Sequence, residues 1–484
     1  MALVDSVQLR PHQQAAIQKY LDNDKHQILA HSLGSGKTIT SLGAVEQSDS
    51  QSTLVLTPAA LIKNYQDSIK KFVKPEDQRK YTVMSYERFR MDPMRFISQI
   101  KPDTMVVDEY HRQKDPQGVS FKALAQARPF IKNFIGLTGT VVQNTPAEIF
   151  PLVNLATGKF NTKNISKTDF NKHFTKVEKV YPKGLSGISA RIMGRYGEKR
   201  VLKDTSKLEH LVKPVIDKNM PTEEFMSHFP KKEFKEIDVP MTGKQEDLYN
   251  YFMKKDIGFL DRWRIKHDLP PKAKNSNAFF AKLMHAREIA NTPTVLSNKL
   301  KDADPIANSG KLNVAYKNLL KHLKSDKVNK AMIYSNFTES GIQPFINQLS
   351  KDRIPFGVFT GKVTRKSKNQ DITDFNEGKK KVLLVSPSGA EGLDLKGVTL
   401  QQIIDPHWNP EKMNQIFGRA VRFNSHAALP PEKRKTIIEK YKSVERPGFF
   451  SRLLGKKPKS SIDQYIYNRA KEKEELNTQF NNLI

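Results

Sequence analysis

His31-Ser-Leu-Gly-Ser-Gly-Lys-Thr38 is the stretch that decides the fold we expect for this chain of 484 residues. It lies between two apolar segments, 27–30 and 39–45, and this order predicts a strand, a glycine loop and a helix. Glycines let such a loop turn its N–H groups inward, and the positive end of the following helix dipole faces the same anion. The stretch therefore predicts a phosphate-binding loop, although the full pattern has glycine where this chain has His31.

Residues of this loop have separate expected roles in binding ATP and Mg²⁺. Lys37 would reach the β- and γ-phosphates, and the hydroxyl of Thr38 would hold Mg²⁺. Upstream, Gln13 can offer both a donor and an acceptor to the adenine edge. A glycine turn before an ordinary helix is the alternative. The residues expected to bind ATP here are Gln13, Leu33, Gly34, Ser35, Gly36, Lys37 and Thr38.

Two adjacent carboxylates follow the apolar segment 105–107. We expect Asp108 to hold the Mg²⁺ that Thr38 binds, and Glu109 to orient the attacking water. Two carboxylates at the end of a buried strand are costly without a cation, so a strand that merely ends in polar residues is the weaker reading. His111 either links this site to a neighbouring motif or lies on the surface.

Other apolar segments also end in small or polar residues. Ligands of parallel sheets bind at the carboxyl ends of strands, so these residues are candidates for contact with a nucleic-acid backbone. They are Thr57, Pro58, Ser85 and Tyr86. The segment 134–140 ends in Thr138 and Thr140, which we expect to couple the carboxylate loop to the bound strand. Each of these could instead be an ordinary loop residue.

Four segments, in this order and at these spacings, resemble the motifs of superfamily 2 helicases, and within them the Swi/Snf type. They are 9–13, 33–38, 108–112 and 137–144. The resemblance implies an α/β fold with two tandem RecA-like parallel lobes, helical insertions between them and a charged helical C-terminus. It also implies that ATP and Mg²⁺ bind between the lobes and that nucleic acid binds across them.

A second α/β lobe is expected after residue 309. Short strands at 331–336, 357–361, 381–386 and 402–405 alternate with helices, a pattern that predicts a second parallel sheet without a phosphate loop. Its function would come from the tips of its strands. The residues expected to contact DNA there are Ser335, Asn336, Thr360, Gly361, Ser386 and Trp408.

Later segments of this lobe extend the resemblance. The segment 386–394 resembles the fifth helicase motif, which implies that Gly392 and Asp394 contact ATP, and 405–410 is similar to a Swi/Snf hallmark. Gln415 is expected to couple ATP hydrolysis to nucleic-acid binding. Arg419 and Arg422 stand three apart, so we expect them on one helical face, where they would neutralise charge on the γ-phosphate. A basic, exposed helix face is the alternative.

The segment 422–434 narrows the resemblance to Swi/Snf-related ATPases of large DNA viruses, the group that contains the poxvirus transcription ATPases. The expected domains are lobe 1 at 1–160, a bridging and helical insertion region at 161–308, lobe 2 at 309–430, and a basic excursion with a C-terminal helix at 431–484. Helices are expected at 245–254 and 277–290. The paired arginines that usually precede the bridge are not evident.

The composition restricts the partners. Lys and Arg total 81 against 51 for Asp and Glu, and the formal charge of +30 points to a polyanion, most simply nucleic acid. With no cysteine there are no disulfides and no cysteine-based zinc sites. No apolar run approaches the roughly 20 residues of a membrane span, and the N-terminus lacks a secretory signal. We therefore expect an intracellular protein without a membrane partner.

Together these features predict a DNA-dependent ATPase that moves along double-stranded DNA. A strand-separating DNA or RNA helicase is the second hypothesis. A third is a nucleic-acid-binding subunit of a transcription complex that uses ATP only as a switch. RNA polymerase, or other transcription and repair proteins, are the expected protein partners.

Overall fold

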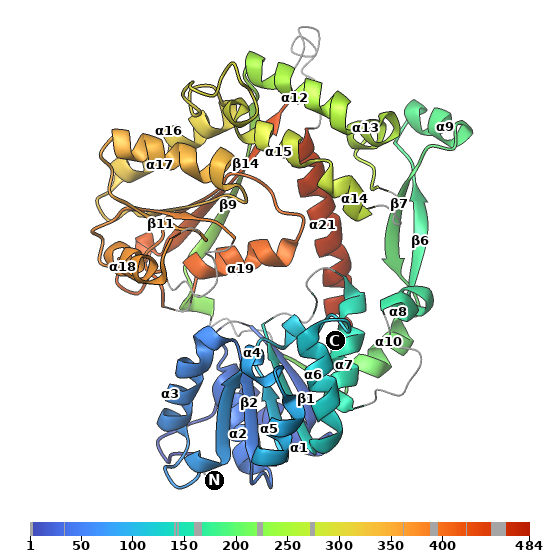
Figure 1. Cartoon of the computed structure of the whole chain (residues 1–484), viewed down its shortest axis with the longest axis vertical. Helices are drawn as coiled ribbons and strands as arrows, with labels where there is room; N and C mark the ends of the chain where they lie inside the picture. Colours follow the sequence, from blue (N-terminus) through green and yellow to red (C-terminus); the bar gives the residue numbers. More distant parts are fainter. Residues whose placement is uncertain are drawn as a thin grey trace. The chain divides into compact units, whose positions relative to one another are not determined.

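The computed structural model describes residues 3–32, 34–139, 142, 145–158, 167–219, 226–271, 276–361, 363–387, 395–422, 424–446 and 461–484. The chain divides into two compact units (Figure 1). Unit 1 comprises Met1–Lys176, Val201–Thr222 and Lys473–Ile484, and unit 2 comprises Val177–Arg200 and Glu223–Glu472.

Unit 1 is built on a six-stranded sheet in which all neighbouring strands are parallel. In spatial order its strands are β3 (Tyr81–Ser85), β2 (Thr53–Thr57), β4 (Thr104–Val107), β5 (Asn133–Thr138), β1 (His26–His31) and β8 (Ile216–Asn219). Its helices are α1 (Pro11–Asp22), α2 (Lys37–Gln47), α3 (Ile62–Phe72), α4 (Tyr86–Phe89), α5 (Pro93–Ile100), α6 (Val119–Ala127), α7 (Ile149–Thr157), α8 (Lys167–Phe174) and α10 (Thr205–Val212).

The apolar strands of unit 1 supply two hydrophobic cores, one on each face of the sheet. Successive side chains of a strand point to opposite faces. Accordingly, Ile28 and Leu54 belong to one buried cluster, whereas Leu29 and Val55 belong to the other. A parallel sheet covered on both faces explains why these strands read as unbroken apolar runs in the sequence.

Unit 2 contains a second six-stranded parallel sheet. In spatial order its strands are β11 (Phe356–Phe359), β12 (Val382–Val385), β10 (Ala331–Tyr334), β13 (Leu400–Ile403), β14 (Lys435–Val444) and β9 (Lys231–Pro240). The helices that follow these strands or precede them include α16 (Gly310–Ser325), α17 (Gln343–Lys351), α18 (Arg365–Asn376) and α19 (Pro410–Ala420). As in unit 1, the buried clusters alternate along each strand, with Met332 in one and Ile333 in the other.

A helical layer forms a separate hydrophobic cluster in unit 2. Its helices are α12 (Gly243–Asp256), α13 (Phe259–Lys266), α14 (Ser276–Ala281), α15 (Met284–Asn291) and the first part of α21 (Ile462–Asn481). A two-stranded sheet of β6 (Thr175–Val180) and β7 (Gly197–Leu202) carries α9 (Leu185–Ile192) between its strands. Among the helices of the described ranges, none is both long and apolar enough to cross a membrane.

The two predicted parallel α/β lobes are confirmed, and every predicted strand lies within one residue or two of an observed one. The predicted domain limits need correction. The region 161–308 supplies an edge strand to each sheet, β8 to the first and β9 to the second, and β14 lies in the segment predicted as a C-terminal excursion. These strands escaped prediction because β9 is charged and mostly exposed and β8 has only four residues.

The single helix predicted over 277–290 is two helices in the structure. α14 ends at Ala281, and α15 begins at Met284.

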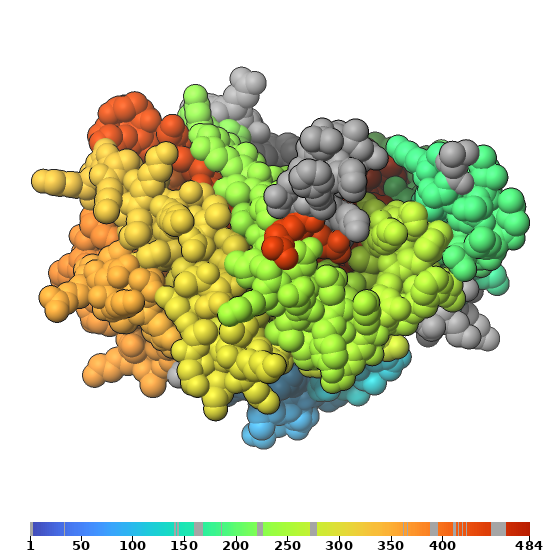
Figure 2. Space-filling view, turned by 90° about the horizontal axis from the view of Figure 1, so that it is seen from above, coloured from blue at the N-terminus to red at the C-terminus, as the bar shows by residue number. Residues whose placement is uncertain are grey.

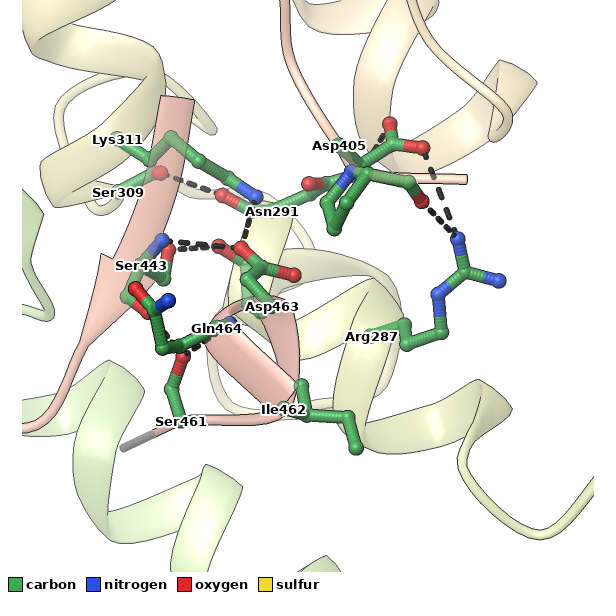
Figure 3. A network of polar contacts seen from close by, with 12 residues as sticks. Arg287, Asn291, Ser309, Lys311, Asp405, Ser443, Ser461, Ile462, Asp463 and Gln464 are labelled. Atoms are coloured by element: carbon green, nitrogen blue, oxygen red, sulfur yellow. Dashed lines mark hydrogen bonds and ion pairs between the residues drawn. The ribbon is translucent and has the colours of Figure 1, made fainter. Parts of the chain in front are cut away.

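The start of α21 is fixed to unit 2 by a fully buried ion pair (Figure 3). Nζ of Lys311 lies 2.7 Å from Oδ2 of Asp463, and both side chains are 0% exposed. The same oxygen accepts the backbone N–H of Ser443 at 2.9 Å, so one carboxylate joins α16, β14 and α21. Removing one partner of such a pair leaves an uncompensated buried charge.

This geometry predicts that Lys311→Met lowers the free energy of unfolding by about 3–5 kcal/mol. The double variant Lys311→Met/Asp463→Asn should recover most of the loss, because the amide oxygen still accepts from Ser443 and no charge is left unpaired. Urea unfolding followed by circular dichroism measures both. Lys317→Met, an exposed position on the same helix, is the control, and equal midpoints for all variants would contradict the role of the pair.

Candidate active site

The phosphate loop has the backbone that the sequence predicts. β1 ends at His31 and α2 begins at Lys37. Gly34 and Gly36 have φ of 83° and 85°, a conformation that other residues rarely adopt. A Cβ on Gly36 would also lie 2.5 Å from Nε2 of Gln13. Leu33 lies outside the described residues.

Two side chains of α1 contact the same carbonyl oxygen of this loop. Nε2 of Gln13 donates to the carbonyl oxygen of Ser35 at 3.1 Å, and a ring nitrogen of His12 lies 3.1 Å from the same oxygen. Oε1 of Gln13 accepts the N–H of Arg10 at 2.9 Å, and Gln13 is 4% exposed. In this structure Gln13 therefore holds the loop, and the predicted contact with adenine would need these bonds to be exchanged.

Lys37 lies inside the loop. Its Nζ donates to the carbonyl oxygens of His31 at 2.9 Å and Ser32 at 3.0 Å. Burial lowers the pKa of Lys37, while the charges of Glu109 and Asp108 act in the opposite direction. The carboxylates thus favour the protonated lysine that phosphate binding requires.

His31, the residue that departs from the glycine pattern, is anchored by a residue that sequence reasoning missed. Its Nε2 lies 2.6 Å from Oδ2 of Asp217 on β8, and His31 is 0% exposed. Lys19 of α1 adds a cation 3.8 Å from the same carboxylate. Asp217 comes 186 positions later in the chain, in a short strand without a motif, so no local pattern signals this pair.

The predicted carboxylate pair follows β4 as expected. Oδ2 of Asp108 accepts the hydroxyl of Thr57 at 3.0 Å, and Oδ1 accepts the N–H of Glu109 at 2.9 Å. Burial, and next the charge of Glu109, raise the pKa of Asp108. Glu109 has a φ of 49°, a left-handed conformation that costs about 1 kcal/mol or more outside glycine and is concentrated at functional sites.

His111 connects Glu109 to the end of β5. Its Nδ1 lies 3.1 Å from the hydroxyl of Thr138 and 3.4 Å from Oε2 of Glu109. His111 therefore contacts residues of two motifs, and the coupling role of Thr138 stays a prediction. Thr140 lies outside the described residues.

No group of three or more His, Cys, Asp or Glu side chains in the described part of the chain could hold a metal ion by itself. Mg²⁺ usually binds through one or two protein oxygens, waters and substrate phosphates. A hydroxyl at Thr38 and a buried carboxylate with a raised pKa at Asp108 fit such a site, because a cation would relieve the charge that burial disfavours.

In unit 2, the carboxylate of Asp405 joins the tips of two strands, and Figure 3 shows it together with Asn291 and Arg287. It is 1% exposed and accepts the N–H of Asn336 at 3.0 Å and the amide of Asn291 at 3.3 Å. The hydroxyl of Ser335 donates to it as well. Ser335 and Asn336 follow β10 and Asp405 follows β13, so this carboxylate fixes both loops.

Arg287 of α15 completes this cluster. It donates to the carbonyl oxygen of Pro406 at 2.7 Å, and its guanidinium carbon lies 4.9 Å and 4.6 Å from the ring centres of Phe337 and Trp408. Trp408, predicted to contact DNA, therefore stacks on a buried cation in this structure.

Most residues predicted to contact DNA are buried in this structure, and their contact with DNA stays a prediction. The buried ones are Thr57, Pro58, Ser85, Tyr86, Ser335, Thr360 and Ser386, whereas Asn336 and Trp408 are half-buried and Gly361 is exposed. Several hold loops instead: Tyr86 donates to the carbonyl of Asp108, and Ser85 caps α4. A hydroxyl group or an aromatic ring at the end of a strand can support a loop or contact a ligand, and the sequence alone does not distinguish these two roles.

The predicted helical face with Arg419 and Arg422 is wrong. α19 ends at Ala420, and Arg422 lies two residues beyond it, where its N–H donates to the hydroxyl of Ser425 at 3.1 Å. The glycine before Arg419 weakens the helix there. The side chains of Gln415 and Arg419, and the residues Gly392 and Asp394, lie outside what the structure describes.

The pairing of His31 with Asp217 predicts a measurable cost. Asp217→Ala would leave a buried ring nitrogen without its acceptor, which costs about 1–3 kcal/mol in stability. It should also raise the KM for ATP, because the carbonyl of His31 accepts from Lys37. Thermal unfolding and steady-state hydrolysis test this, with Asp22→Ala of α1 as control. An unchanged melting temperature for Asp217→Ala would contradict it.

Three domain families match the chain. The SNF2-related domain matches residues 77–295, the helicase conserved C-terminal domain matches residues 313–424, and the type III restriction enzyme res subunit family matches residues 6–143. A solved structure of the Sulfolobus solfataricus SWI2/SNF2 ATPase core in complex with dsDNA aligns over 99% of this chain and 97% of its own, at 18% identity and with a TM-score of 0.38.

Three relatives illustrate the range of similar proteins. A protein of Acanthamoeba polyphaga mimivirus, whose name describes an ATP-dependent RNA helicase, is 28% identical over 99% of this chain and 97% of its own length. The termination factor NPH-I homolog of African swine fever virus is 22% identical over 96% of this chain and 76% of its own. Protein CHROMATIN REMODELING 25 of Arabidopsis thaliana is 23% identical, and this chain spans 55% of its length. With these matches and a formed phosphate loop and carboxylate pair, the chain is similar to the Swi/Snf-type ATPases of superfamily 2, which are ATP-hydrolysing enzymes.

Proposed function

We propose that this protein is a DNA-dependent ATPase that moves along double-stranded DNA without separating its strands. The observation that carries the proposal is that Asp108 and Glu109 act on Lys37 within one unit, where their charges counteract the lowering of its pKa by burial. Thr57 holds Asp108, and His111 contacts Glu109. The SNF2-related and helicase C-terminal matches and the formal charge of +30 support a nucleic-acid substrate.

Each residue of the site has a role in hydrolysis. Lys37 exchanges its bonds to the loop carbonyls for phosphate oxygens, and the inward-facing N–H groups of the glycine loop complete the cradle. Thr38 and Asp108 would hold Mg²⁺, which supplies charge neutralisation at the phosphates. Glu109 accepts a hydrogen bond from the attacking water and orients it. Thr57 and the N–H of Glu109 fix the Asp108 carboxylate.

Coupling to nucleic acid follows from the chain of contacts at β5. Because His111 touches both Thr138 and Glu109, movement of the loop after β5 would displace the carboxylate that orients water. Contact of Arg419 and Arg422 with the γ-phosphate stays a prediction. The conformational change on ATP binding, and its reversal after hydrolysis, would shift the contacts of the protein with the DNA backbone. This shift would move the protein along the DNA by one step.

A strand-separating RNA or DNA helicase is the second candidate, because the mimivirus relative bears the name of an RNA helicase. The African swine fever virus relative, named a termination factor, favours a partner in transcription, and we propose RNA polymerase as that partner. The ATP-switch hypothesis is weaker, because a switch needs no carboxylate to orient water.

The proposed function predicts which nucleic acid stimulates hydrolysis. Steady-state ATPase activity should rise strongly with duplex DNA and little with single-stranded DNA or duplex RNA. Preference for RNA, together with release of a labelled strand from a forked substrate, would replace translocation by strand separation. No stimulation by any of them would contradict a nucleic-acid motor.

Substitutions at the site separate its functions. Glu109→Gln should lower turnover by about 100-fold or more while ATP still binds, because the water loses its acceptor but the shape is kept. Lys37→Ala should abolish turnover and weaken ATP binding, with duplex affinity unchanged. Nucleotide binding by fluorescence, duplex binding by anisotropy and phosphate release measure the three quantities. Full turnover in Glu109→Gln would remove Glu109 from the mechanism.

A further inference from the structure

The segment 177–200 of unit 2, which we call the basic arm, lies outside the site described above. It contains the ends of β6 and β7 and all of α9, and it has six Lys or Arg against two Glu. Figure 2 shows it in teal-green at one edge of the face, next to the yellow-green residues around α13. Arg195 of the arm lies over the ring of Phe259, 5.5 Å from its centre.

Three of these cations surround one pocket. Lys179, Lys183 and Arg191 line a pocket of about 490 Å³, together with Val180, Tyr181, Pro182, Gly184, Gly187 and Ile188. All three cations are exposed, and none forms an ion pair with a residue in the described ranges. Three like charges around one hollow repel one another, and an anion in the hollow would relieve that repulsion.

Tyrosine rings hold two of the cations in place. The guanidinium of Arg191 lies 5.2 Å from the ring centre of Tyr181, and Nζ of Lys179 lies 4.7 Å from that of Tyr196. The two rings are 6.2 Å apart. A cation that is stacked on a ring loses less freedom when it binds an anion than one on a free side chain.

The chemistry of the pocket favours nucleic acid over an acidic protein segment. Arg and Lys, with tyrosine rings between them, suit phosphate groups that repeat along a backbone. Next to the pocket, Ile192 at the end of α9 and Met193 directly after it are 82% and 61% exposed, and apolar side chains flanked by cations are a feature of proteins that bind the minor groove.

We propose that the basic arm binds the phosphate backbone of the duplex on which the motor acts, through residues other than those predicted to contact DNA from the sequence. This inference rests on the proposed function. The arm would hold the duplex while other parts of the motor change their contacts with it, so it should affect affinity for DNA and leave the chemical step unchanged.

The test compares two variants with the same loss of charge. Lys179→Gln/Lys183→Gln/Arg191→Gln empties the pocket of cations. Lys317→Gln/Lys321→Gln/Lys324→Gln removes three exposed lysines of α16, which belongs to the same unit. Binding of a labelled duplex is measured by anisotropy over a range of salt, and ATPase activity is measured with and without duplex. Circular dichroism melting confirms that both variants fold.

The arm variant should bind duplex at least about tenfold more weakly than the control variant, and its salt slope should fall by about two to three units, since each lost phosphate contact contributes about 0.9. Its turnover at saturating duplex should equal that of the control. Equal duplex affinity of the two variants, while duplex still stimulates hydrolysis by the wild-type protein, would overturn the proposed role of the arm and leave the proposed motor function intact.

Polyglutamate, a model of an acidic protein segment, is tested in the same binding assay. If the arm variant loses polyglutamate binding but binds duplex as the wild-type protein does, the partner of the arm is an acidic protein and not DNA. Wild-type hydrolysis without duplex stimulation would overturn the proposed function itself.

Discussion

Two adjacent carboxylates at the end of a buried strand are the constraint on which unit 1 depends. Asp108 and Glu109 repel one another, and burial raises the pKa of Asp108. The fold tolerates them for two reasons. The positive charge of Lys37 interacts with both carboxylates, and the hydroxyl of Thr57 and the backbone N–H of Glu109 donate hydrogen bonds to Asp108. Burying these charges lowers the stability of the fold. Binding of a cation by the carboxylates and of a phosphate group by Lys37 would offset that cost, and this favours the chemistry of the site.

Much of this arrangement could be predicted from the sequence because it depends on local rules. Strands buried on both faces read as apolar runs, such as 54–56, and the two glycines of the loop adopt positive φ because they lack a Cβ. Asp108 and Glu109 follow such a run directly. For these elements residue type and spacing determine position, so the sequence was sufficient for the apolar strands of both sheets and for the phosphate loop.

The remainder depends on contacts that no local pattern encodes. Gln13 binds the carbonyl of Ser35 in this structure, a contact that its sequence context does not signal, and its expected contact with adenine stays a prediction. The edge strands β8 and β9 are short or charged, since an edge needs little apolar surface. Arg422 falls outside α19 because a spacing of three residues says nothing about where a helix ends. The polar strand tips of unit 2 bind Asp405, a partner from another strand.

The pair of His31 and Asp217 has a consequence for the biosynthesis of the protein. The two residues are 186 positions apart, and at typical translation rates of about 5–20 residues per second the carboxylate is made roughly 10 to 40 s after the histidine. During that interval β1 lacks its neighbour β8 and is an open sheet edge, which can pair with other chains. The ATP-binding loop is therefore completed only after a segment that carries no recognisable motif has left the ribosome.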